Sequence, residues 1–220
     1  MTHPGGDVSS DASPPSASSA SPRFGSRATR WWIAVLAVLA ALMVLRPVFV
    51  ETYTVPSISM EPALSPGDRI VVDKHGSIHR GDLVVFVADE AFYGRDSDRG
   101  VLQRLGDFFG VRPSEHVFVK RIIGLPGERV SVDAAGTLRI DGRVQHEAYL
   151  PDGVRASTTP FTTRVPPGRY FVMGDNRGAS DDSRNHLGDP GGGSVRASDV
   201  IGDVVWRYWP KDGWGSVDHE

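Results

Sequence analysis

The sequence contains no cysteine among its 220 residues. This absence excludes a disulfide framework, a cysteine-ligated zinc site, an iron–sulfur centre and any thiol nucleophile. An excess of basic charge is also missing, because 24 basic residues stand against 27 acidic ones and the net charge is −3. We therefore expect no nucleic-acid partner, since such a partner requires many basic side chains against phosphates. Any covalent catalysis must use serine, threonine, lysine or a carboxylate.

Large apolar side chains are scarce in residues 1–30, where Met1, Val8 and Phe24 are the only ones. Eight serines, four prolines and three glycines make up half of this segment. Such a composition cannot bury enough apolar surface to offset the entropy that ordering would cost. We expect residues 1–30 to be a disordered tail.

The next segment lacks polar residues. Residues 31–45 read WWIAVLAVLAALMVL, and residues 48–50 are again apolar after Arg46 and Pro47. Twenty helical residues span about 30 Å, roughly the hydrocarbon thickness of a bilayer. The run predicts a transmembrane helix over residues 31–50. A buried core helix would show a polar face, and a cleaved signal peptide should end in a small-x-small sequence.

Basic residues lie on one side of this predicted helix. Arg23, Arg27 and Arg30 precede it, whereas residues 47–67 contain no lysine or arginine. The positive-inside rule then places the N-terminus in the cytoplasm. We expect a single-pass protein of the cytoplasmic membrane, with residues 51–220 forming an extracytoplasmic domain.

The pattern of residues 51–220 favours a mainly β domain with many turns, in keeping with 25 glycines and 16 prolines in the chain. Runs of β-branched and aromatic residues predict strands over 48–55, 69–74, 83–87, 117–123, 129–132, 137–140, 170–173 and 200–208. Two stretches interrupt them. Residues 89–115 are an insertion in which a short helix over 101–109 is expected, and residues 188–194 are a glycine-rich loop.

Two serines stand in a proline-bounded segment at the end of an extended apolar run. Ser57 and Ser59 lie between Pro56 and Pro62. Proline fixes φ and removes a backbone donor, so this segment can hold a serine hydroxyl and a neighbouring N–H toward one point. A plain turn is the alternative, and these residues alone leave both open.

A nucleophilic serine needs a base. The seven histidines lie near the termini or beside glycines, charges and turns, so we expect them to be solvated loop residues. Lys120 lies instead within the apolar run 117–123. Alternation along a strand permits a solvent-facing lysine there. If Lys120 faces inward, burial would lower its pKa from about 10.4 toward about 7 to 8 and make the neutral amine a usable base.

A dense polar loop, residues 174–184, follows the strand expected at 170–173. Four of its side chains offer the oxygen ligands of a calcium loop: Asp175, Asn176, Asp181 and Asp182. Arg177 and Arg184 stand among them and argue against calcium. Paired acids and arginines favour a network of charge-assisted hydrogen bonds.

Five stretches that follow in order along the chain resemble the bacterial type I signal peptidases, a family of membrane-bound serine proteases. They are residues 46–50, 57–64 (SISMEPAL), 67–74 (GDRIVVDK), 119–128 (VKRIIGLPGE) and 174–184 (GDNRGASDDSR). The resemblance implies a mainly β fold of coiled antiparallel sheets behind a single transmembrane helix. One departure is Ala63, where the family usually has threonine, and we expect this change to be tolerated.

The resemblance also implies a catalytic apparatus that needs no cofactor and no metal. Ser59 corresponds to the nucleophile and Lys120 to the general base, a Ser–Lys variant of triad logic. The backbone N–H of Ser59 and the hydroxyl of Ser57 correspond to the oxyanion donors. Ser180 would orient Lys120, while Asp182 and Arg184 would hold the loop.

The substrates implied by the resemblance are secretory preproteins, cut after a small-x-small sequence at the surface of a phospholipid membrane. Five positions near the dyad would line shallow apolar subsites: Tyr53, Val55, Met60, Phe118 and Val119. Core packing is the alternative for the same side chains. A substrate in extended conformation can add to a β-rich enzyme through main-chain hydrogen bonds.

Two other functions fit parts of the sequence. A self-cleaving repressor-type peptidase also uses a serine and a lysine, but it would lack the anchor and would bring a DNA-binding module. An anchored, non-catalytic β module with a polar binding loop belongs to a different class. That module predicts an exposed Lys120 with ordinary titration.

Overall fold

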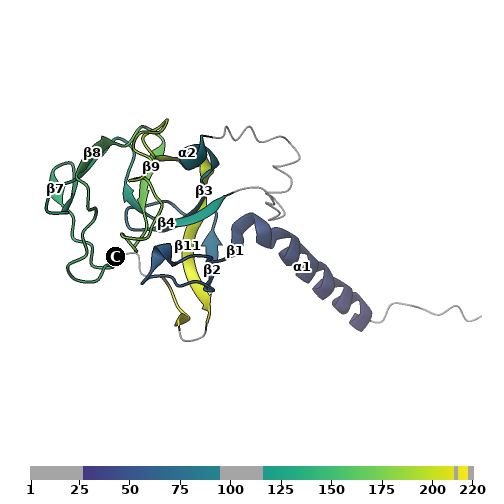
Figure 1. The fold of residues 1–220 in the computed structure, drawn as a ribbon. Coiled ribbons are helices and arrows are strands. Elements are labelled where there is room, and N and C mark those ends of the chain that lie inside the picture. The colour runs from purple at the N-terminus through teal and green to yellow at the C-terminus, as the bar shows by residue number, and fades with distance from the viewer. Residues whose placement is uncertain (1–26, 95–115, 211–212, 218–220) are drawn as a thin grey trace, which may run out of the picture. The chain divides into compact units, whose positions relative to one another are not determined.

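The structure is a computed structural model that describes residues 27–94, 116–210 and 213–217 (Figure 1). The chain forms two compact units, Met1–Ala41 and Leu42–Glu220. The helix expected at 101–109 and nearly all of the tail expected at 1–30 lie outside the described residues.

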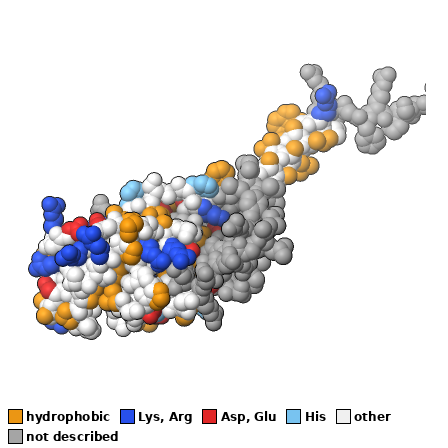
Figure 2. All heavy atoms as spheres, turned by 90° about the horizontal axis from the view of Figure 1, so that it is seen from above, with side chains coloured by type: hydrophobic (Ala, Val, Ile, Leu, Met, Phe, Trp, Pro, Cys, Tyr) orange, Lys and Arg blue, Asp and Glu red, His pale blue; other side chains and the backbone are white. Residues whose placement is uncertain are grey.

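Helix α1 (Arg27–Phe49) contains the apolar run of residues 31–45. Alanine and leucine, which are strong helix formers, supply much of this run, and no glycine interrupts it. Several of its apolar side chains are exposed, among them Trp31, Trp32 and Leu36 (Figure 2). Within the part of the chain that the structure describes, no helix combines enough length and apolar character to cross a membrane. The membrane anchor stays a prediction.

Seven antiparallel strands form the larger sheet, in the order β1-β2-β11-β3-β4-β9-β10 (Figure 1). They are β1 (Val50–Thr54), β2 (Arg69–Asp73), β3 (Leu83–Val87), β4 (Val117–Gly124), β9 (Arg169–Met173), β10 (Val195–Arg196) and β11 (Val200–Trp209). β3 lies at the centre and all five of its residues are buried. Because side chains alternate along a strand, Leu83 and Val85 join one apolar cluster while Val84 and Phe86 join another.

Four strands form a smaller sheet, in the order β7-β6-β5-β8. They are β5 (Arg129–Val132), β6 (Leu138–Ile140), β7 (Arg143–Val144) and β8 (Phe161–Arg164). Asp141 and Gly142 connect β6 to β7 with φ of 49° and 82°. Positive φ at both positions suits an Asp-Gly hairpin turn. A third apolar cluster, which includes Val130 and Phe171, joins this sheet to β9 of the larger one.

After α1, the helices among the described residues are short. They are α2 (Asp89–Tyr93) and the 3-10 turns η1 (Ile58–Met60) and η2 (Ala197–Asp199). The prediction of a mainly β, antiparallel domain is confirmed, and each of the eight expected strands has a counterpart. The sequence reading missed β7, β8 and β10 because they are two to four residues long and have few apolar residues.

Candidate active site

Ser59 lies in η1, a few residues after the edge strand β1. The turn is anchored in the core by Met60, which is 1% exposed. The carbonyl of Met60 also accepts a hydrogen bond from Leu64 N at 2.9 Å. Ser57 precedes the turn in extended conformation and is exposed. Its Oγ lies 3.2 Å from Ser59 Oγ. The two serine hydroxyls are therefore within hydrogen-bond distance of each other.

Lys120 lies on β4, where it pairs in register with Val84 of the buried strand β3. Its side chain points inward and is 1% exposed. Lys120 Nζ donates a hydrogen bond to Ser59 Oγ at 2.7 Å. The sequence left the orientation of Lys120 open, and the structure shows the inward one. The prediction of an exposed Lys120, which a non-catalytic β module requires, is contradicted.

Burial is the main reason why the pKa of Lys120 is lowered from 10.5 to about 8. Removing an ammonium group from water penalises its charged form. The carboxylates of Asp182, Asp181 and Asp175 oppose this shift, whereas Arg184 adds to it. A substantial fraction of Lys120 is therefore the neutral amine near pH 8, and that form can accept a proton.

The polar loop, residues 174–184, contacts the serine turn through Asn176. Asn176 N donates to Ser59 O at 3.1 Å, and its side-chain Nδ2 donates to Ile58 O at 3.2 Å. Gly174 allows this approach, since a Cβ there would lie 2.5 Å from Ser59 O and 2.1 Å from Ser180 Oγ. The sequence analysis assigned Asn176 no role beyond a possible ion ligand, so this contact was missed.

Asp182 and Arg184 hold the polar loop in its conformation. Arg184 Nε and Nη2 donate to the two Asp182 oxygens at 2.8 and 2.7 Å. Asp182 Oδ2 also accepts from Gly174 N at 2.9 Å. The guanidinium of Arg184 and the bond from Gly174 lower the pKa of Asp182 in spite of its burial. Ser180 is buried nearby, and in the described residues its hydroxyl forms no hydrogen bond to Lys120.

A buried ion pair joins β4 to the polar loop. Arg121 follows Lys120 on β4, and its Nε and Nη2 donate to Asp175 at 2.9 and 2.7 Å. Both side chains are 0% exposed. Arg121 Nη1 also donates to Gly81 O at 2.7 Å. Sequence reasoning assigned no role to Arg121, although an arginine in an apolar strand calls for a buried acidic partner.

One histidine departs from the expectation of solvated loops. His186 is only partly exposed, stacks on Phe92 with 4.4 Å between ring centroids, and hydrogen-bonds Asp189 and Asp181 at 2.7 and 3.0 Å. The expectation was wrong for this residue because the aspartates lie three and five positions away, where a turn brings them together. In the described part of the chain, no three His, Asp or Glu side chains are grouped to hold a metal ion.

The five expected subsite residues differ in how deeply they are buried. Val55 and Met60 are buried in the apolar cluster that also includes Leu64, and Tyr53 and Val119 pack against it while partly exposed. The Phe118 ring lies 5.4 Å from Lys120 Nζ. Their role in binding substrate stays a prediction.

Comparison with known proteins gives consistent matches. The family model described as "Signal peptidase, peptidase S26" matches residues 28–209. The signal peptidase I of Mycobacterium tuberculosis is 35% identical over 244 residues, covering 96% of this chain and 83% of that protein. The signal peptidase I U of Bacillus subtilis is 32% identical over 189 residues, covering 81% and 86%.

These matches define the chain as a hydrolase of the serine peptidase class. The chain belongs to the signal peptidase family, peptidase S26. Its reaction is the removal of signal peptides from preproteins.

Proposed function

We propose that the protein cleaves signal peptides with Ser59 as the nucleophile and Lys120 as the general base. The observation that carries this assignment is the 2.7 Å contact of a 1% exposed lysine amine with a serine hydroxyl. Serine is a weak nucleophile at neutral pH and needs an adjacent base. A lysine serves as that base only when burial lowers its pKa, which is the case here.

In the first half of the reaction, neutral Lys120 accepts the Ser59 proton as Oγ attacks the scissile carbonyl. A tetrahedral intermediate forms and its C–N bond breaks. The new ammonium gives the proton to the leaving amine, and the signal peptide remains as an ester on Ser59. Lys120 then takes a proton from a water molecule that attacks this ester, and returns it to Ser59 Oγ as the signal peptide leaves.

The negative oxygen of the tetrahedral intermediate needs donors held in place before the reaction. We assign this role to the backbone N–H of Ser59 and the hydroxyl of Ser57. Ser57 Oγ lies 3.2 Å from Ser59 Oγ, which supports the assignment. Loss of one such donor typically costs about 10²- to 10³-fold in rate.

The cleavage site is expected to have small residues that fit shallow subsites lined by Tyr53, Val55, Met60, Phe118 and Val119. β1, which leads to the serine turn, is an edge strand of the larger sheet. An edge strand has free main-chain groups that can pair with an extended peptide. This arrangement supports a substrate bound by strand addition.

The proposed setting is the outer face of the cytoplasmic membrane. The run without polar residues at 31–45 falls within α1, and its exposed apolar side chains need a nonpolar surrounding. Arg27 and Arg30 at its start support a cytoplasmic N-terminus by the positive-inside rule. We assign residues 1–30 to a cytoplasmic tail, 31–50 to the anchor and 51–220 to the extracytoplasmic catalytic domain.

The pH dependence of cleavage tests the lysine base. Below pH 8 most Lys120 is an ammonium ion and cannot accept the Ser59 proton. We expect kcat/KM for a purified preprotein in detergent to rise with pH through about 8, the pKa of Lys120. Product is measured as the mature N-terminus by mass spectrometry. A rate independent of pH from about 6 to 10 would contradict a lysine base.

The topology is tested with epitope tags on the two ends of the full chain. A protease added to intact cells is expected to remove a tag at the C-terminus and to spare one at the N-terminus. Both tags should be lost after the cells are lysed, which controls for access. Loss of the N-terminal tag alone from intact cells would refute the proposed orientation.

A further inference from the structure

The segment that follows β7 is joined to the polar loop by an ion pair. Arg177 of the polar loop donates from Nη1 and Nη2 to the two Glu147 oxygens at 2.9 and 2.5 Å. The two side chains are only 3% and 11% exposed. Bidentate, charge-assisted hydrogen bonds of this kind are strong and fix geometry. The segment after β7 is thereby bound to the loop that contacts Ser59.

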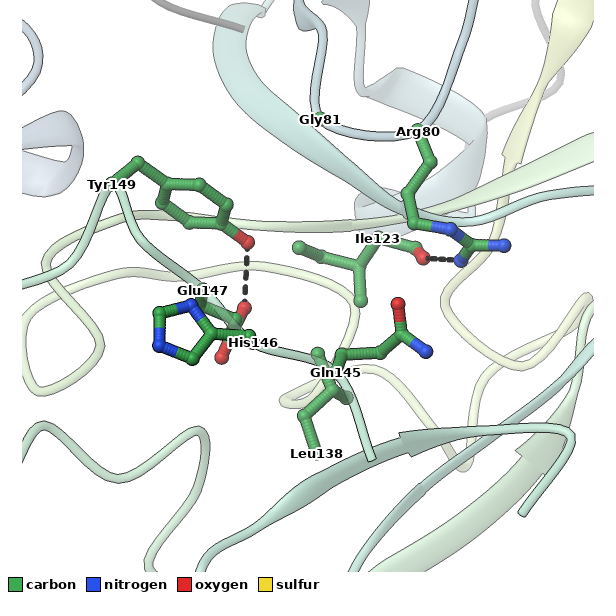
Figure 3. A pocket seen from close by; sticks show the side chains of 8 residues that line it. All are labelled: Arg80, Gly81, Ile123, Leu138, Gln145, His146, Glu147 and Tyr149. Atoms are coloured by element: carbon green, nitrogen blue, oxygen red, sulfur yellow. Dashed lines mark hydrogen bonds between the residues drawn. The ribbon is translucent and has the colours of Figure 1, made fainter. Parts of the chain in front are cut away.

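Tyr149 makes a second connection from the same segment. Its ring covers the Arg121 guanidinium, with 3.8 Å from Cζ to the ring centroid. Its hydroxyl donates to Glu147 Oε1 at 2.6 Å, as Figure 3 shows. Burial and the neighbouring Glu147 raise the pKa of Tyr149, so the hydroxyl stays protonated and remains a donor. Tyr149 therefore ties Arg121 of β4 to Glu147.

Each of the two connections leads toward one member of the dyad. Arg177 Nε donates to Gly174 O at 3.0 Å, within the loop whose Asn176 bonds to Ser59 O. Arg121 directly follows Lys120 in β4. Glu147 and Tyr149 thus form a clamp with their partners Arg177 and Arg121. The contact with Arg177 fixes the loop beside Ser59, and the contact with Arg121 fixes the strand that carries Lys120.

The space beside the clamp is not filled by side chains. A cavity of about 220 Å³ borders Glu147 and Tyr149, and Arg80, Ile123 and Leu138 line its other walls (Figure 3). Apolar packing on that side therefore cannot replace the polar contacts of Glu147 and Tyr149. If these contacts are lost, the segment has room to move.

We propose that Glu147 and Tyr149, which lie in the segment between β7 and β8, are positioning residues for signal-peptide cleavage. The proposal rests on the assignment of Ser59 and Lys120 as the dyad. Neither Glu147 nor Tyr149 touches the reacting atoms. They act by holding the polar loop against the serine turn and Arg121 against β4.

Glu147→Gln in the full chain tests the proposal, because it removes the charge and keeps the size. We expect kcat for a preprotein in detergent to fall about 10- to 100-fold, since small displacements of catalytic groups have effects of this size. KM should change less than threefold, because Glu147 is not placed at the subsites. The matched control is Glu128→Gln. Glu128 pairs with Arg80 at 2.6 Å but contacts neither the polar loop nor Arg121, and its kcat should stay within twofold of wild type.

The pH profile separates positioning from general destabilisation. Lys120 is faced by three carboxylates, Asp182, Asp181 and Asp175, and by the Arg184 guanidinium. If the polar loop loosens, water reaches Lys120 and the largest cause of its lowered pKa weakens. The kinetic pKa of Glu147→Gln should therefore rise, whereas that of Glu128→Gln should not. Unchanged kcat and pH profile with a lower melting temperature would overturn the proposal.

Two further variants keep the test decisive. If Glu147→Gln does not fold, Tyr149→Phe is tested in its place. This change removes only the hydroxyl that donates a hydrogen bond to Glu147. It should lower kcat and raise the kinetic pKa in the same direction, and wild-type values for both would refute the clamp. Ser59→Ala is assayed in parallel. Cleavage by Ser59→Ala means that the proposed dyad is wrong, whereas an inactive Ser59→Ala with unaffected clamp variants means that only the clamp is wrong.

Discussion

Replacing Lys120 with methionine is expected to lower kcat/KM for a preprotein by about 10²- to 10⁴-fold, the usual contribution of a general base. Methionine has a similar length and no charge, so it fills the buried site without a proton acceptor. The fold should survive, because an apolar residue at a 1% exposed position incurs no cost of burying a charge. Cleavage is measured with the purified full chain in detergent, at pH 7 and at pH 9.

The matched control is Lys74→Met. Lys74 directly follows β2, and its Nζ lies 3.4 Å from Glu51 of β1. This variant should retain the wild-type rate and its dependence on pH. Ser59→Ala should lose cleavage to a similar or greater extent, and the double variant should be no worse than the more impaired single variant, because the two residues act as a unit. Substantial cleavage by Lys120→Met at either pH would rule out the assigned base.

Asp175→Asn is expected to lower the free energy of unfolding by about 3–5 kcal/mol, the range for breaking a buried ion pair. The change leaves Arg121 charged in a site where both side chains are 0% exposed. Burying a charge without a partner is costly. Urea unfolding of the detergent-solubilised full chain, followed by tryptophan fluorescence, measures the loss. Cleavage should fall as well, because Asp175 lies in the loop that contacts Ser59.

A control for this stability effect is Asp133→Asn. Asp133 lies on the surface, where its contact with Arg139 is 3.4 Å long and both side chains are over a third exposed. Exposed ion pairs contribute little, so this variant should unfold at nearly the wild-type urea concentration. Equal effects of the two substitutions on the free energy of unfolding would mean that the buried pair stabilises the fold no more than the exposed pair does.

Most strands were predictable because their signals are local. The run Leu83 to Val87 has only β-branched and other apolar residues, which is typical of a strand buried on both faces, and it became the central strand β3. The Asp141-Gly142 pair predicted the turn that it forms. Strand β8 gave no such signal, because two threonines and an arginine follow its one large apolar residue.

The site depends on long-range pairing, which a single sequence does not reveal. Alternation along β4 could not decide whether Lys120 or Arg121 faces the core, and in fact both side chains are buried, on opposite faces. Lys120 reaches Ser59, whereas Arg121 finds Asp175, 54 positions away. Glu147 was missed for the same reason, since its partner Arg177 lies 30 positions away.

The separation of the site residues along the chain also bears on when activity begins. Ser59 and Lys120 are 61 positions apart, and Asn176 meets the serine turn across 118 positions. Any fragment that ends before Asn176 lacks part of this site, and pairing of distant strands is slow compared with local folding. A chain still emerging from the ribosome therefore lacks part of this site until the polar loop has been made, and the site can assemble only after distant strands have paired.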